Sequence, residues 1–223
     1  MSDDDSRLRP ALRDRLAGHS VVVTGAGTGE GVGNGQAIGR LLAAQGAAVV
    51  CGDLHRDRAE QVAAGIRDDG GTAAAVAGDV RDPEVAAALV QAAVDLSGRL
   101  TGLVCTVGIG GATSVLHPPD PDPWQQVLDV NVTGALRCVR AAAPALVAAG
   151  GGSIVTVGST AGMRYYQPGA LAYATSKAAL TGLTTSVAGE LGPHRVRANT
   201  VVIGQVWSPM VAAAAARQAD PAA

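Results

Sequence analysis

The chain has 223 residues, of which 48% are hydrophobic and 16% charged, and its formal net charge is −2. This length suits one domain with a well-buried core, and the charge excludes a basic surface that would bind nucleic acid or an anionic membrane. The chain contains no Phe, so Ala, Val and Leu must fill the interior.

The N-terminus and the cysteines indicate where the protein works. Residues 1–5 are acidic and have no apolar signal core, and no run of about 18 apolar residues could cross a bilayer. We therefore expect a cytoplasmic protein without a membrane partner. Cys51, Cys105 and Cys138 lack the spacing of metal ligands, so we expect buried, reduced thiols and no metal site.

Short β-branched runs alternate with Ala-rich amphipathic stretches along the whole chain. This alternation predicts βαβ units and a single α/β domain over residues 1–223, with loose ends at 1–15 and 211–223. The domain would be a doubly wound, Rossmann-type parallel sheet with helices on both faces. Pro144 is expected to kink or end the helix that contains it. The predicted strands are residues 20–24, 47–51, 72–77, 100–106, 153–157 and 197–202, and the predicted helices are residues 35–45, 56–69, 123–147, 172–191 and a stretch that begins at Pro83.

A glycine-rich turn follows the first predicted strand, with glycine at every second position from Gly25 to Gly35. Glycines let the backbone turn tightly and approach a pyrophosphate, and the next helix offers N–H groups and a positive dipole end. The alternative is an unstructured glycine loop, which the strand–turn–helix context argues against.

Two aspartates follow the next two strands. The Asp53 carboxylate can accept hydrogen bonds from an adenosine ribose and would repel a 2′-phosphate, so NAD is favoured over NADP. Arg56 lies close enough in sequence to weaken that preference. Each aspartate could instead be a simple cap, but Asp79 lies on the same carboxyl edge of the sheet, where ligands bind in open α/β folds.

Tyr173 and Lys177 are four residues apart, so both side chains project from one face of a helix. An adjacent ammonium stabilises phenolate and should lower the tyrosine pKa. Such a pair could exchange a proton with an alcohol or a carbonyl near neutral pH. This spacing is common by chance, and its place among the other motifs gives it weight.

Together these motifs resemble the classical short-chain dehydrogenase/reductase family over residues 16–210. The resemblance implies a nicotinamide cofactor and hydride transfer to or from a secondary alcohol or ketone. Thr24, Gly25, Gly29 and Gly31 match its TGxxxGxG turn, and residues 204–210 resemble the segment that flanks the nicotinamide. The residues expected at the cofactor are Gly25, Gly29, Gly31, Gly33, Gly35, Asp53, Leu54, Asp79, Val80, Gly108, Tyr173, Lys177, Val206 and Ser208.

The same resemblance assigns four catalytic roles. Tyr173 would be the acid/base, and Lys177 would lower its pKa and hold the nicotinamide ribose. Ser159 would hydrogen-bond the substrate oxygen, and Asn131 would position a water that leads to solvent. Simpler interpretations are a turn residue for Ser159, a buried amide for Asn131 and a solvated helix face for Lys177.

The choice of Ser159 needs an argument, because Thr160 has the usual spacing before the tyrosine. The S-x-A-G pattern selects Ser159 instead, with one extra residue in 163–172. A side chain on the strand end is fixed by the sheet, while the following loop can absorb the insertion. Tyr165 and Tyr166 in that loop either contact substrate or are surface aromatics.

The chain departs from the family pattern in four places. Four residues are inserted in the glycine turn, so the pyrophosphate could face Gly33 and Gly35 rather than Gly29 and Gly31. The usual Asn-Asn-Ala-Gly is replaced by residues 105–108, and the usual Pro-Gly by residues 203–204. The segment after Met210 is short, which we expect to leave a C-terminally shortened fold with an exposed sheet edge.

These departures keep a second hypothesis open beside an NAD-dependent oxidoreductase. The rival is a nucleotide-binding subunit with little or no catalysis. A serine hydrolase is less favoured, because Val157 occupies the place of the first glycine in G-x-S-x-G. The expected partners are a small alcohol or ketone substrate and a second copy of the chain, since family members pair through helices that correspond to 123–147 and 172–191.

Overall fold

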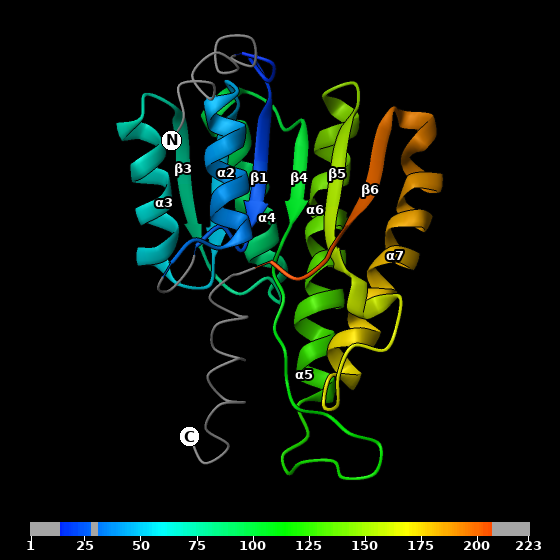
Figure 1. The fold of residues 1–223 in the computed structure, drawn as a ribbon. Helices are drawn as coiled ribbons and strands as arrows, with labels where there is room; N and C mark the ends of the chain where they lie inside the picture. The colour runs from blue at the N-terminus through cyan, green and yellow to red at the C-terminus, as the bar shows by residue number, and fades with distance from the viewer. Residues whose placement is uncertain (1–13, 28–30, 207–223) are drawn as a thin grey trace, which may run out of the picture.

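A six-stranded parallel sheet forms the centre of the protein (Figure 1). The computed structural model describes residues 14–27 and 31–206, so Gly29, Ser208 and most of the predicted loose ends lie outside the described residues. The strands follow the order β3-β2-β1-β4-β5-β6, and every neighbouring pair is parallel, which confirms the predicted Rossmann-type sheet. They are β1 (Ser20–Thr24), β2 (Ala48–Asp53), β3 (Thr72–Ala77), β4 (Gly102–Cys105), β5 (Gly152–Ser159) and β6 (Val196–Ile203).

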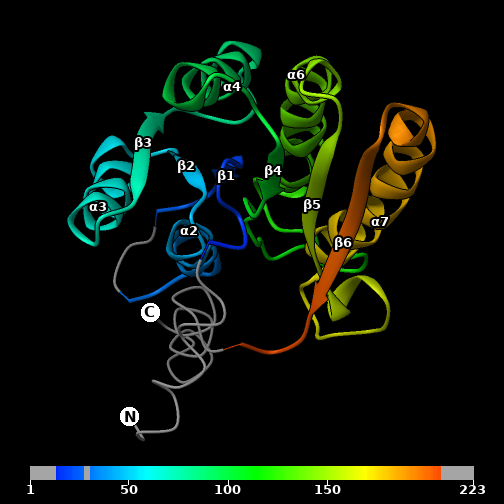
Figure 2. The same cartoon turned by 90° about the horizontal axis from the view of Figure 1, so that it is seen from above.

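Helices cover both faces of this sheet (Figure 2). On one face α2 (Asn34–Ala44) and α3 (Arg56–Asp68) pack on β1, β2 and β3. On the other face lie α4 (Pro83–Ser97), α6 (Gly134–Ala148) and α7 (Leu171–Leu191). The strand order reverses between β1 and β4, and this switch point is where open α/β sheets bind ligands, at the carboxyl ends of the strands.

The long helix predicted over residues 123–147 is divided. It consists of α5 (Trp124–Leu128), a π-helical turn (Asp129–Thr133) and α6, which continues through Pro144 to Ala148. The interruption therefore lies at Asp129–Thr133. The helix continues through Pro144 to Ala148, so Pro144 does not end it, and a kink at Pro144 stays a prediction. Single π turns recur at functional sites because they displace side chains from the regular helical register, and this one contains Asn131.

The core consists of small and branched aliphatic side chains, as the composition predicts. Val22, Val50, Leu103 and Ile154 are at most 1% exposed at the centre of the sheet. The three cysteines are free and buried, which confirms the prediction of reduced interior thiols, and burial raises the pKa of Cys51 to about 12. None of the described helices is long and apolar enough to cross a membrane.

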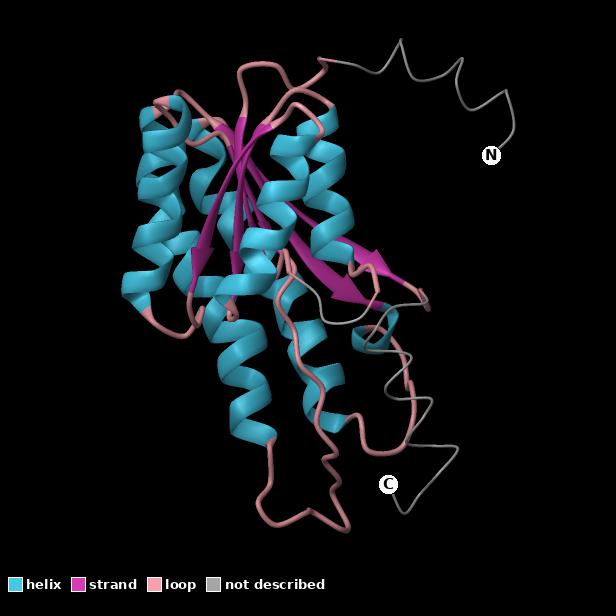
Figure 3. Cartoon of the chain, turned by 90° about the vertical axis from the view of Figure 1, so that its left-hand side faces the viewer, coloured by secondary structure: helices cyan, strands magenta, loops and turns pink. Residues whose placement is uncertain are grey.

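The β6 end of the sheet is open within the described residues. There β6 pairs with β5 alone, and its side chains Val201 and Val202 are 50% and 38% exposed. The expected exposed edge is therefore present in this part of the chain. Two long connections, between β4 and α5 and between β5 and α7, extend beyond the carboxyl edge of the sheet (Figure 3).

Candidate active site

The glycine turn after β1 brings two backbone segments into very close contact. Gly25 has φ +69°, and a Cβ there would lie 2.9 Å from Oγ1 of Thr106. A Cβ on Gly35 would lie only 1.9 Å from the carbonyl oxygen of Gly25. Gly33 is the N-cap of α2, so Gly33 and Gly35 form the start of the helix. Which of these glycines face the pyrophosphate, Gly33 and Gly35 or Gly29 and Gly31, stays a prediction.

Asp53, at the end of β2, is tied to this turn by both carboxylate oxygens. Its Oδ2 accepts a hydrogen bond from the Gly27 N–H at 3.0 Å, and its Oδ1 accepts one from the His55 N–H at 3.0 Å. A Cβ on Gly27 would lie 2.8 Å from the same carboxylate. Leu54 follows with 60% of its surface exposed. The carboxylate therefore lies at the carboxyl edge of the sheet beside the glycine turn.

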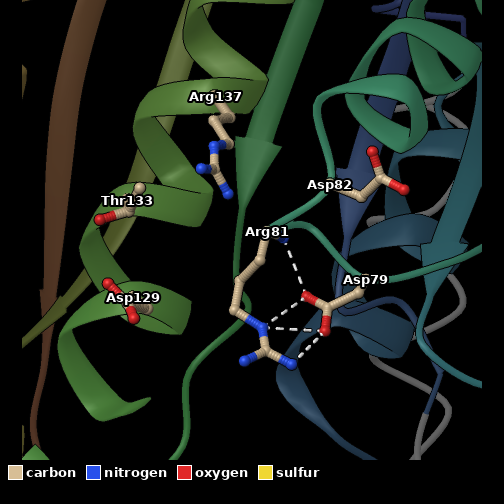
Figure 4. A pocket seen from close by; sticks show the side chains of 6 residues that line it. All are labelled: Asp79, Arg81, Asp82, Asp129, Thr133 and Arg137. Carbon is tan, nitrogen blue, oxygen red and sulfur yellow. Dashed lines mark hydrogen bonds and ion pairs between the residues drawn. The ribbon is translucent and has the colours of Figure 1, made fainter. Parts of the chain in front are cut away.

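Asp79, which was predicted to contact the cofactor, forms an ion pair with Arg81. Asp79 Oδ1 accepts a hydrogen bond from the Arg81 Nε and Oδ2 accepts from both Nε and Nη2, and these bonds hold the Asp79 pKa below its ordinary value. Val80 is buried against Gly134. The ion pair lines an open polar hollow of about 370 Å³ between α4 and the π turn (Figure 4). The hollow contains none of the predicted catalytic side chains; its lining residues are Asp79, Arg81, Asp82, Asp129, Thr133 and Arg137.

Ser159 and Tyr173 come together at the carboxyl end of β5. Burial raises the pKa of Tyr173, while a hydrogen bond with the Ser159 hydroxyl lowers it and the Tyr166 phenol raises it. The Ser159 hydroxyl also accepts a hydrogen bond from the Ala161 N–H at 3.2 Å. Ser159 is the last residue of β5, whereas Thr160 begins the following 3-10 turn (Thr160–Gly162). Ser159 therefore lies next to Tyr173, and the choice of Ser159 over Thr160 as the group that binds the substrate oxygen stays a prediction.

Lys177 is buried beneath Tyr173 rather than solvated. It is 4% exposed, its Nζ donates to the Val157 carbonyl at 2.9 Å, and burial lowers its pKa to about 8. Nζ lies 5.6 Å from the centre of the Tyr173 ring. The prediction that Lys177 lowers the Tyr173 pKa is wrong for this arrangement, because burial dominates and Ser159 supplies the lowering. Lys177 is also the only lysine in the chain.

Asn131, on the π turn, fastens the loop after β4 to α7. Its Oδ1 accepts from the Ile109 N–H at 2.8 Å, and its Nδ2 donates to the Ile109 carbonyl at 3.0 Å. Nδ2 also donates to the Ser176 hydroxyl at 2.9 Å, and that hydroxyl donates to the Tyr173 carbonyl. The nearby Gly108 lies against Lys177, since a Cβ there would be 3.1 Å from Nζ. Asn131 thereby connects the loop to the backbone of the tyrosine.

Thr106 links β4 to β1 at the position where the family pattern has an Asn-Asn pair. Its hydroxyl contacts the carbonyl oxygens of Thr24 at 2.6 Å and Gly25 at 3.2 Å. It therefore joins the end of β4 to the start of the glycine turn. Sequence reasoning did not identify Ser176 or Thr106 as functional residues. The available signals were a polar side chain at a strand end, for Thr106, and a polar side chain on the buried face of a helix, for Ser176.

Comparison with known proteins identifies the family. A family model described as short chain dehydrogenase matches residues 19–219. The chain belongs to the short-chain dehydrogenase family. It is 38% identical to cis-4-hydroxycyclohexanecarboxylate dehydrogenase of Sinomonas cyclohexanicum over 202 residues. The matched region covers 91% of this chain and 77% of that enzyme.

Solved structures agree with this assignment. The fold matches a short-chain dehydrogenase/reductase from Burkholderia xenovorans with a TM-score of 0.84 and 33% identity, over 91% of this chain and 77% of that one. It also matches an NAD+-bound xylitol dehydrogenase with a TM-score of 0.79 and 32% identity, over 88% and 74%. The protein is accordingly an NAD(P)-dependent oxidoreductase that interconverts an alcohol and a carbonyl compound.

The residues present in this short-chain dehydrogenase fit a nicotinamide dinucleotide. The contacts at Gly25 and Gly35 leave no room for a Cβ, as a backbone that approaches a pyrophosphate requires. The Asp53 carboxylate, the first turn of α2 and Lys177 all lie at the carboxyl edge of the sheet. Val206 is 46% exposed after β6, and Gly31 has φ +88° before α2; their predicted contacts with the cofactor stay predictions.

Proposed function

We propose that this chain is an NAD-preferring dehydrogenase of cyclic secondary alcohols, in which Tyr173 is the acid/base. The observation that carries the proposal is the position of Tyr173 over the buried Lys177, whose Nζ lies 5.6 Å from the centre of the tyrosine ring, beside Ser159 at the end of β5. The cyclic substrate class is supported by the similarity to cis-4-hydroxycyclohexanecarboxylate dehydrogenase. The chemistry is a two-electron oxidation of CH–OH to C=O, with the proton and the hydride removed separately.

Tyr173 would take the hydroxyl proton of the alcohol while Ser159 hydrogen-bonds the same oxygen. The chemistry that a bound nicotinamide would supply is that of a hydride acceptor. In the opposite direction Tyr173 returns the proton to the carbonyl oxygen. Because Ser159 is fixed at the end of β5 and Tyr173 on α7, the substrate oxygen can meet both hydroxyls at once.

Lys177 and Asn131 would position the cofactor and the backbone around Tyr173 and Ser159. Lys177 presents an ammonium next to Gly108, where it can hold the nicotinamide ribose. Asn131 holds Ile109 and Ser176, so we propose that it keeps the loop after β4 in register with α7. The proton-relay water predicted at Asn131 stays a prediction. Tyr165 is 81% exposed and Tyr166 interacts with Tyr173, so of the two Tyr166 is the better candidate for substrate contact.

A spectrophotometric substrate screen tests the proposed activity. Purified protein is mixed with NAD or NADP and a panel of cyclic, acyclic secondary and primary alcohols, and reduced nicotinamide is followed by absorbance. We expect turnover with cyclic secondary alcohols, faster with NAD. Calorimetric binding of NAD without turnover of any alcohol or ketone would favour the non-catalytic nucleotide-binding rival instead.

The Asp53→Asn variant tests the cofactor preference. Removing the charge removes its repulsion of a 2′-phosphate, so the ratio of kcat/KM for NADP to that for NAD should rise about tenfold, or about 1.4 kcal/mol. The matched control is Asp57→Asn, the same charge change at an exposed residue in the first turn of α3. An equal ratio in the parent, Asp53→Asn and Asp57→Asn proteins would contradict the assignment.

We also propose a cytoplasmic homodimer, on the family resemblance of the helices α6 and α7. Light scattering at working concentration should give the mass of two chains. A stable tetramer would contradict this assembly.

A further inference from the structure

The helix that carries Tyr173 and Lys177 begins without a capping side chain of its own. Its N-cap residue is Ala170, which has no side-chain acceptor. The first N–H groups of any α-helix lack partners within the helix, and a Ser, Thr, Asp or Asn at the N-cap normally accepts from the second or third of them. In α7 these two positions are Ala172 and Tyr173.

Thr113, which lies 59 positions away in the chain, supplies the missing acceptor. Its Oγ1 accepts a hydrogen bond from the Ala172 N–H at 2.8 Å. Its own N–H donates to the Gly169 carbonyl at 3.0 Å, and Thr113 and Ala170 form an isolated parallel bridge. The side chain is buried, with 2% exposed. A threonine of the β4–α5 connection thus caps the helix of the β5–α7 connection.

This contact divides the β4–α5 connection into an anchored root and an exposed tip. Asn131 holds the root at Ile109, and Thr113 is held at the start of α7. Immediately beyond Thr113, Val115 and Leu116 are 79% and 82% exposed. Thr113 is therefore a buried junction between the β4–α5 and β5–α7 connections, and its partner Ala172 immediately precedes the proposed catalytic tyrosine.

We propose that Thr113 is a positioning residue, whose hydroxyl fixes the first turn of α7 so that the Tyr173 phenol stays against Ser159. Tyr173 is the residue after Ala172, so a displacement of the capped N–H moves the phenol directly. The kinetic consequence rests on the proposed function, whereas the structural link between the two connections does not.

Two substitutions at this position separate the hydroxyl from the rest of the side chain. Thr113→Val keeps the branched shape and removes the acceptor, and Thr113→Ser keeps the acceptor and removes the methyl group. The matched control is Thr184→Val, a substitution within α7 itself. Thr184 is 4% exposed, and its hydroxyl bonds the Leu180 carbonyl and Thr156. The control therefore loses a buried hydroxyl of the same helix, three turns from Tyr173.

Steady-state kinetics give the functional readout. Thr113→Val should lower kcat roughly ten- to hundredfold with little change in the KM for the nucleotide, as expected when a reacting group is displaced by about 1 Å. Thr113→Ser should restore most of kcat, and Thr184→Val should retain it. Equal kcat in Thr113→Val and Thr184→Val, or equal losses in Thr113→Val and Thr113→Ser, would overturn the proposal.

Amide hydrogen exchange gives a readout that needs no turnover. In Thr113→Val the Ala172 and Tyr173 amides should exchange at least about tenfold faster, while the amides near residue 184 stay protected. In Thr184→Val the amides near residue 184 should exchange faster, while the Ala172 and Tyr173 amides stay protected. If the Ala172 amide exchanges faster in Thr113→Val but the parent protein turns over no substrate, the structural link is supported and the proposed function is contradicted. Unchanged exchange at Ala172 would overturn the link itself.

Discussion

Replacing Tyr173 with Phe is expected to lower kcat by roughly 10²- to 10⁴-fold, the range typical for loss of a general acid/base. The substitution removes one hydroxyl and leaves the ring, so the fold and the affinity for the nucleotide should be retained. Steady-state assays with the best alcohol of the screen measure kcat. Calorimetric titration with NAD measures the affinity for the nucleotide separately.

The pH dependence gives a second signature of the same tyrosine. Burial raises the Tyr173 pKa, so at neutral pH the phenol is protonated and can donate to a carbonyl. Alcohol oxidation needs the phenolate, so its rate should climb as the pH rises into the alkaline range, and ketone reduction should decline over the same range. Tyr173→Phe should lose both trends.

Tyr165→Phe is the matched control, since it makes the same chemical change eight positions away at a side chain that is 81% exposed. We expect its kcat to stay close to that of the parent. If Tyr173→Phe and Tyr165→Phe were equally active, with the same pH profile, Tyr173 would not be the acid/base.

Gly35→Ala is expected to be the most damaging change in the nucleotide site. Its Cβ would lie 1.9 Å from the Gly25 carbonyl oxygen and 2.7 Å from the Thr106 hydroxyl. Because the nearest atom belongs to the backbone, no rotamer change relieves the clash, and the turn or the start of α2 must move. Overpacking of this kind costs about 1–3 kcal/mol or more. Chemical denaturation should show this loss of unfolding free energy, and calorimetry should show loss of NAD binding.

Gly189→Ala provides the control for this substitution. Gly189 is on the exposed side of α7, and a Cβ there meets nothing within 4 Å. Alanine should stabilise the helix by about 0.4–1 kcal/mol, because it reduces the entropy of the unfolded chain. If Gly35→Ala were as stable as the parent protein and still bound NAD, the glycine turn would accommodate a Cβ at this position, contrary to the prediction.

The elements that were predicted well have strong local signals. The bounds of β1 follow from its β-branched run, those of β3 from the glycines Gly71 and Gly78 on either side of it, and the start of α4 from Pro83. The order of these elements then determines the sheet and its switch point, and with it the edge where Tyr173, Lys177 and Ser159 meet. The fold and the location of the site could therefore be predicted from one sequence.

The contacts that could not be predicted all join distant segments. Nothing around Asn131 signals a π turn, and nothing near Thr113 or Thr106 indicates which backbone group each hydroxyl meets. The electrostatic error at Lys177 has the same origin. Sequence spacing gives the distance between two side chains along a helix, but burial and the Val157 carbonyl decide what the ammonium does.

The single lysine of the chain makes its proposed cofactor site chemically addressable. All other basic side chains apart from histidine are guanidinium groups, so an amine-directed reagent finds one ε-amine, at Lys177, besides the α-amine. Since burial lowers its pKa to about 8, that amine is partly neutral and nucleophilic in mildly alkaline buffer, where ordinary lysines stay charged. One mass increment on this side chain would thus report access to the interior of the site, without a mutation or a substrate.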